Sequence, residues 1–164
     1  MFVLRFKAKN RGKALRYSLI AALIIFLVIF AVVKNSGAKA DTATCDELGE
    51  YSVAALTEEQ QLDVLRSFGI DNAELTESDE ITIPEEFNSL TEKYNELQKK
   101  IGLDLSPYKG QKAERLIFKY SPGGSGEGYA VLLINDGRLI GGHLTSRVYG
   151  DEVRPLTDGK NGTT

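Results

Sequence analysis

Apolar and polar residues follow two periods along this chain, a helical one in its middle and a strand-like one near its end. The first helical stretch begins at "TEEQ", where Thr57 suits an N-cap and Gln60, three residues later, completes a capping box. Gly69 ends the stretch. Its apolar face consists of Leu62, Val64, Leu65 and Phe68. The pattern predicts an amphipathic helix from about Thr57.

A second helix is predicted from Pro84, a residue that suits the first helical position. Glu85 and Glu86 favour the positive end of the helix dipole, and Gly102 marks the end. Apolar residues recur at helical spacing at Phe87, Leu90, Tyr94, Leu97 and Ile101. These residues are expected to face the core.

Strand-like alternation surrounds this second helix. Before it, Ile81 and Ile83 predict a short edge strand, preceded by an acidic turn. After it, three strands are predicted, at 115–121, 129–135 and 138–149, and Asp-Gly at 136–137 predicts a hairpin turn between the last two. The run "YAVLLI" is apolar throughout, so its strand is expected to be central and either covered on both faces or covered on one face and shielded on the other.

These elements predict an α+β fold with two helices packed on a small, mainly antiparallel sheet, a three-stranded C-terminal meander plus an edge strand. The folded domain is expected at 51–149. Residues 34–50 are small and polar and are expected to form a tether. Residues 150–164 lose periodicity and are expected to form a flexible tail.

One uncharged apolar run, Tyr17–Val33, precedes the domain. Its seventeen residues span about 25 Å as a helix, slightly less than the roughly 30 Å hydrocarbon core of a bilayer. Arg16 and Lys34 flank the run and can snorkel to the interfaces. We predict a single transmembrane helix that follows a basic cytoplasmic segment, 1–16.

The charge distribution sets the expected topology. Residues 1–40 carry eight Lys or Arg and no Asp or Glu, whereas residues 41–164 carry twelve against twenty-three. Basic residues beside a membrane segment favour the cytoplasmic side, which places the acidic domain outside the cytoplasm. An acidic domain is a poor partner for nucleic acid. The alternative is a signal peptide cleaved after Ala40, at the A-x-A pattern of Ala38 and Ala40, which would give a secreted protein.

The chain has one cysteine, Cys45, so no intramolecular disulfide can form. Because it lies in the expected tether, Cys45 is interpreted as a linker thiol. A thiol on a partner chain would allow a disulfide-linked dimer.

Three stretches carry a resemblance to a known family: "FGI", then "ITIPEEFNSLTEKYNELQKKIGLDLSPYKG", then "INDGRLIGGHLTS". Residues 62–148 resemble a domain of unknown function found mostly in membrane-anchored or exported proteins of Gram-positive Firmicutes. Ile70 stands where that family favours an aromatic residue, which removes the case for an aromatic ligand platform. The family has no assigned activity, so the resemblance implies location and fold and no catalytic residue.

The sole histidine, His143, is the main candidate for chemistry. Thr145 and Arg147 share its strand face, whereas Ser146 points to the opposite face. Gly141 and Gly142, inside the same strand, predict a bulge or the close approach of another backbone, including a bound peptide or polymer. These five residues are the binding candidates, and no catalytic residue is assigned.

No metal site or cofactor is expected. The acidic cluster lacks the loop spacing and central glycine of an EF-hand, so it is interpreted as a solvated turn. Its members are Glu74, Glu77, Asp79 and Glu80.

Three functions fit these patterns. The first is a membrane-anchored, noncatalytic domain that binds an envelope protein or polymer. The second is an envelope-associated hydrolase that uses the His143 strand face. The third is a regulatory or structural subunit of a membrane complex, in which the Tyr17–Val33 helix contacts the partner.

Overall fold

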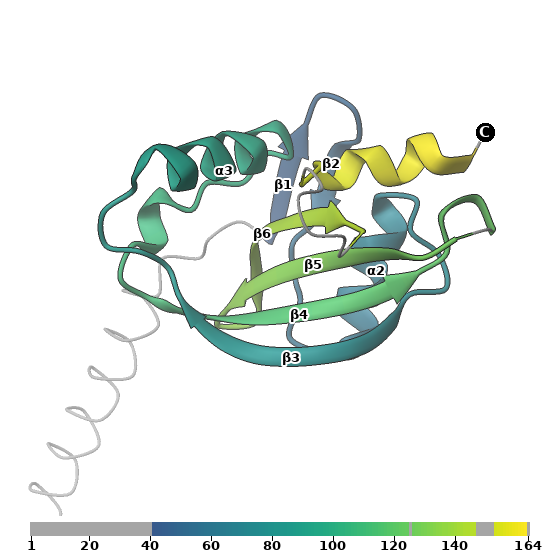
Figure 1. Ribbon diagram of the computed structural model, residues 1–164, viewed down its shortest axis with the longest axis horizontal. Coiled ribbons are helices and arrows are strands. Elements are labelled where there is room, and N and C mark those ends of the chain that lie inside the picture. The colour runs from purple at the N-terminus through teal and green to yellow at the C-terminus, as the bar shows by residue number, and fades with distance from the viewer. Residues whose placement is uncertain (1–40, 125, 147–152, 164) are drawn as a thin grey trace, which may run out of the picture. The chain divides into compact units, whose positions relative to one another are not determined.

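The computed structural model describes residues 41–124, 126–146 and 153–163, all within one compact unit, Ala40–Thr164 (Figure 1). Its strands are β1 (Thr42–Cys45), β2 (Gly49–Ser52), β3 (Glu74–Thr82), β4 (Lys112–Tyr120), β5 (Gly128–Asn135) and β6 (Arg138–Thr145). Its helices are α2 (Glu58–Ser67), α3 (Ser89–Lys100) and the 3-10 helices η1 (Ser106–Tyr108), η2 (Pro122–Gly124) and η3 (Leu156–Thr163). The fold is α+β, as predicted.

The main sheet is an antiparallel meander in the order β3-β4-β5-β6, with β3 at its outer margin (Figure 1). Asp136 and Gly137 join β5 to β6 with φ angles of 49° and 72°. Two consecutive positive φ values match the right-handed twist of paired strands. The predicted hairpin turn is therefore confirmed.

Both faces of this sheet are covered. One core joins α2, the β1–β2 hairpin and η3 to the sheet, through Tyr51, Val64, Leu65, Phe68, Leu116, Phe118, Leu132, Leu144 and Leu156 among others. The second core lies on the opposite face, through Ile83, Leu105, Tyr108, Ala113, Ile117, Val131, Leu133 and Ile140, with Tyr94 packed against it. Because β5 contributes to both cores, the prediction that "YAVLLI" is central is confirmed.

Helix α2 begins as the sequence predicts. The Thr57 hydroxyl accepts from the Gln60 amide at 3.3 Å, and the Gln60 side chain accepts from the Thr57 amide at 3.2 Å. This reciprocal pair satisfies backbone groups that the first turn would otherwise leave unpaired. At the other end, Gly69 has a φ of 74°, the left-handed conformation that ends a helix.

Helix α3 begins later than predicted, at Ser89 instead of Pro84. Asn88 is its N-cap, since its side-chain oxygen accepts from the amides of Leu90 and Thr91 at 3.0 Å each. Leu90 is 74% exposed, so its placement on the core face was wrong. The buried side chains of α3 are polar, Asn95 and Gln98, because this face supplies hydrogen bonds to other backbone segments.

The edge strand β3 is longer than predicted. Its nine residues include the acidic stretch that was interpreted as a turn. The edge position is confirmed. The predicted turn was wrong, because β4 supplies basic partners for the acidic side chains: Arg115 pairs with Asp79, and Lys112 pairs with Glu80.

Both ends of the described chain are more ordered than their composition predicts. Residues assigned to the tether form the β1–β2 hairpin, in which Cys45 is 5% exposed and Tyr51 donates to the Ile101 carbonyl at 2.5 Å. Cys45 is therefore a core residue and not a linker thiol, and an intermolecular disulfide would require the hairpin to open. In the predicted tail, Leu156 is fully buried and Arg154 pairs with Leu144.

The predicted membrane helix, Tyr17–Val33, lies outside the described residues, as do the segments 1–16 and 34–40. Within the described ranges, no helix combines the length and apolar character needed to cross a bilayer.

Candidate functional site

His143 lies on β6, on the sheet face that carries the second core. Its Nδ1 atom and the Tyr94 hydroxyl of α3 are 2.8 Å apart, a hydrogen-bond distance. The two rings meet edge to face, with centroids 5.5 Å apart and planes at 82°. Tyr94, which sequence analysis assigned only to packing, therefore fixes the orientation of the imidazole.

The surroundings of this pair keep both rings uncharged. Burial, with a smaller contribution from the Arg115 charge, lowers the pKa of His143 from 6.5 to about 4. Burial also raises the pKa of Tyr94 well above its ordinary value. Near neutral pH the contact is a hydrogen bond between a neutral imidazole and a neutral phenol.

The other predicted residues of this face are only partly brought together. Thr145 is half-buried, lies two residues after His143 and is paired with Tyr129 of β5. Arg147 lies outside the described residues. The hydroxyl group beside the imidazole Nδ1 is that of Tyr94. Binding at these residues stays a prediction.

Gly141 and Gly142 are buried beside a bulge between the Leu133 and Ile134 positions of β5, as their sequence context predicts. The Gly142 amide donates to the Gln98 side-chain oxygen at 2.7 Å. A Cβ at Gly142 would lie 2.8 Å from a Leu156 methyl group. The elements that approach these glycines belong to this chain, and an external peptide would reach them only after Gln98 and Leu156 moved.

The outer edge of β6 is closed at three places. At its start, the Leu139 amide donates to the Val53 carbonyl at 2.8 Å. In its middle, Gln98 accepts from Gly142. Near its end, Leu144 and Arg154 exchange two backbone hydrogen bonds of 2.8 and 3.0 Å. Two separate backbone segments and one side chain thus cover this edge.

The opposite edge of the sheet differs. Among the described residues, β3 pairs with β4 alone. Both backbone groups of Ile83, just after β3, bond toward the β4 side: its amide donates to Gln111 and its carbonyl accepts from Gly110, each at 2.9 Å. Since backbone groups alternate in direction along a strand, those of Ser78, Glu80 and Thr82 face outward. Within the part of the chain that the structure describes, the sheet therefore has one closed edge and one open edge.

Cross-strand contacts hold the side chains of β3 toward β4. Arg115 donates twice to the Asp79 carboxylate, at 2.8 and 2.6 Å, and this bonding lowers the pKa of Asp79. Lys112 pairs with Glu80 at 2.6 Å, which raises the pKa of Lys112. These groups are exposed, so each contact orients a side chain and adds little stability.

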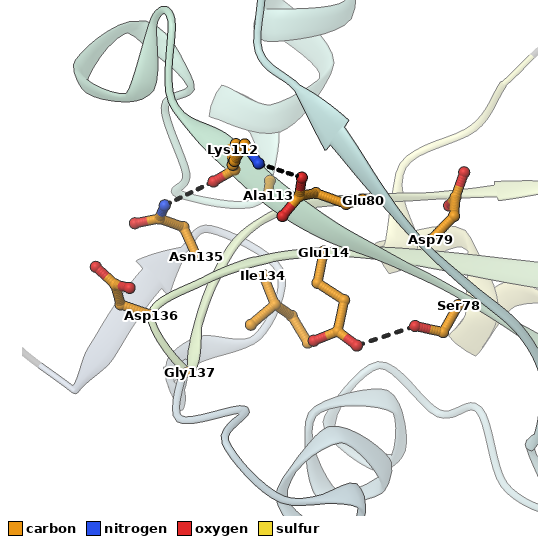
Figure 2. Close-up of a pocket in the computed structure, with 10 residues that line it drawn as sticks. All are labelled: Ser78, Asp79, Glu80, Lys112, Ala113, Glu114, Ile134, Asn135, Asp136 and Gly137. Carbon is orange, nitrogen blue, oxygen red and sulfur yellow. Dashed lines mark hydrogen bonds and ion pairs between the residues drawn. The ribbon is translucent and has the colours of Figure 1, made fainter.

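An acidic hollow of about 460 Å³ lies between β3, β4 and the β5–β6 turn (Figure 2). It is lined by Ser78, Asp79, Glu80, Lys112, Ala113, Glu114, Ile134, Asn135, Asp136 and Gly137. Figure 2 shows Ser78 turned toward Glu114, to which its hydroxyl donates at 3.0 Å. Four carboxylate residues and one lysine give the hollow a negative character, although no group of three potential ligands in the described part of the chain is arranged to hold a metal.

Comparison with known proteins adds one finding. Residues 64–144 match one family model. The family is described as "Domain of unknown function (DUF4830)", and the match runs from α2 to β6 over just under half of the chain. It confirms the resemblance to an uncharacterised domain family. No curated protein and no solved structure matches the chain.

The sequence pattern predicts an edge strand at Ile81 and Ile83, within this DUF4830 match, but not its acidic part, which was interpreted as a turn. A signal was nevertheless present. Asp79 and Glu80 follow one another on the first strand, and their partners Arg115 and Lys112 occur in the reverse order on the second. Opposite charges in this arrangement are typical of antiparallel neighbours.

Proposed function

We propose that this protein is a single-pass membrane protein of the cell envelope, with its N-terminus in the cytoplasm and a noncatalytic binding domain outside. The uncharged run Tyr17–Val33 and the basic residues before it support the location.

The observation that carries the binding role is the difference between the two edges of the sheet. Three separate contacts close β6, whereas the nine-residue strand β3 pairs with β4 alone among the described residues, and the backbone groups of Ser78, Glu80 and Thr82 face outward. An open edge of this length is a template for pairing with another chain unless the protein blocks it. No proline interrupts β3, and two of its four charged side chains, Asp79 and Glu80, pair with residues of β4.

The binding role is tested by photo-crosslinking of the full-length protein in intact cells. A photoreactive residue is placed in turn at exposed positions on α2, α3, the β1–β2 hairpin and β3. A discrete crosslinked species in the membrane fraction, from at least one position, is expected. Absence of any such species from all four elements would refute a binding role.

The location is tested on the same material by fractionation and intact-mass measurement. The full-length mass in the membrane fraction is expected. A soluble mature protein that begins at Asp41 would show that the apolar run is a cleaved signal peptide.

A further inference from the structure

We propose that the outer edge of β3 binds an extended, lysine- or arginine-rich segment of another protein, which adds to the sheet as a fifth strand. This inference rests on the proposed binding function and names the surface and the chemistry of the partner. Main-chain hydrogen bonds would hold such a segment, and its side chains would give specificity.

The backbone of β3 suits strand addition. Ser78, Glu80 and Thr82 direct their amide and carbonyl groups outward, and at about 3.3 Å per residue the nine-residue strand extends roughly 30 Å. The bulge between Leu75 and Glu77 interrupts the regular part of the edge. The outward groups after that bulge therefore form the binding segment.

Charge selects the partner. Strand β3 carries four carboxylate side chains and no basic one. In an antiparallel pair of two copies centred on Ser78, Glu77 of each copy would lie opposite Asp79 of the other. Like charges in directly opposed positions destabilise a sheet, so a second copy of this chain is disfavoured. A strand with alternating lysines would instead place opposite charges beside the carboxylates.

The acidic hollow lies on the sheet face toward which one set of these lysine side chains would point. Ser78 and Glu80 share a sheet face with Glu114, as their register and the Ser78–Glu114 hydrogen bond show. Side chains of an added strand on this face would point along the same side of the sheet, toward the hollow in Figure 2. Its four carboxylate residues outnumber Lys112 and Arg115, the two basic residues that pair with Glu80 and Asp79.

The test measures fluorescence anisotropy of a labelled decapeptide in which Lys alternates with Thr, titrated with the full-length protein in a nonionic detergent. A peptide with Glu in place of every Lys is the charge control. The Lys peptide is expected to bind, more weakly as salt is added, and the Glu peptide is expected not to bind. Equal binding of both peptides would overturn the proposal.

Two variants locate the peptide on β3. Ser78→Pro removes an outward amide, and loss of one such hydrogen bond is expected to weaken binding about tenfold. The double variant E80Q/E114Q removes two carboxylates from the sheet face that borders the hollow and is expected to weaken binding about threefold or more. The variant E47Q/E50Q, with the same charge change on the exposed β1–β2 hairpin, is expected to change binding less than about twofold. Unchanged affinity in a folded Ser78→Pro protein would overturn the proposal.

Hydrogen–deuterium exchange of the unaltered protein provides a readout that does not depend on a variant. Saturation with the Lys peptide is expected to slow exchange over residues 74–82, and unchanged exchange there would overturn the proposal. If deletion of residues 1–16 tightens peptide binding about tenfold, the chain's own basic segment occupies the edge and the assignment to another protein is wrong. Crosslinks from other faces that persist in Ser78→Pro would separate failure of this inference from failure of the binding function.

Discussion

The contact between His143 and Tyr94 predicts a defined loss of stability in acid. The pKa of His143 is lowered from 6.5 to about 4 in the folded protein, chiefly by burial. The unfolded chain therefore binds a proton between these two pH values while the folded chain does not. Linkage then requires that stability fall as pH decreases through this window.

The magnitude follows from the two pKa values. Each pH unit within the window is worth about 1.4 kcal/mol, so the free energy of unfolding falls by about 1.4 kcal/mol at pH 5.5 and about 3 kcal/mol at pH 4 through this group. Above about pH 7.5 the imidazole is almost entirely neutral in both states and contributes little pH dependence.

The assay is urea unfolding of the full-length protein in detergent, followed by far-UV circular dichroism at pH 7.5, 5.5 and 4. His143→Gln keeps a polar side chain beside Tyr94 but does not titrate. Carboxylates such as Asp79 also titrate in acid, but they do so in both proteins and cancel in the difference. A pH dependence of the variant within about 0.5 kcal/mol of the unaltered protein would refute a buried, neutral His143.

Two other predictions concern the packing around α3. Gln98→Leu leaves the buried Gly142 amide without its acceptor and is expected to lower the free energy of unfolding by about 1–3 kcal/mol; an unchanged urea midpoint would contradict the role of Gln98 at the β6 edge. Gly102→Ala is expected to cost about 3 kcal/mol, because its φ is 75° and the new Cβ would lie 2.1 Å from the Thr44 carbonyl oxygen. Gly49→Ala is the matched control, because its φ is also 75° but no atom lies within 4 Å of the new Cβ. It is expected to lower the free energy of unfolding by only about 1 kcal/mol. Equal losses of stability in the two variants would contradict the clash at Gly102.

The elements that sequence analysis placed well have local signals. The capping box at Thr57 and the Asp136–Gly137 turn are each encoded within four residues, so their backbone geometry depends little on the rest of the chain. The central strand is similar, since an uninterrupted apolar run can be stable only where both faces are covered.

The elements that were missed depend on partners far along the chain. The β1–β2 hairpin is held by Tyr51, which reaches the Ile101 carbonyl, and η3 is held by Leu156, whose single apolar side chain gives no period. His143 was found because it is the sole histidine, but its partner, Tyr94, lies 49 residues earlier on another element. Composition cannot reveal such pairings before the topology is known.

Helix α3 shows why hydrophobic period alone does not identify every buried position. Tyr94 packs against the second core and Ile101, the C-cap, is buried, as expected, but Leu90 is exposed. Leu90 and Tyr94 occur at helical spacing in the sequence, yet the buried residues of the helix are Asn95 and Gln98. The side chain of each of these two residues accepts a hydrogen bond, which an apolar side chain cannot do. Asn95 accepts from the Leu105 amide, and Gln98 accepts from the Gly142 amide, which a neighbouring strand would otherwise bind at the β6 edge. A buried amide is stable only with such partners, so these two residues commit α3 to one position on the sheet. Among the described residues, β3 at the other edge of the sheet pairs with β4 alone.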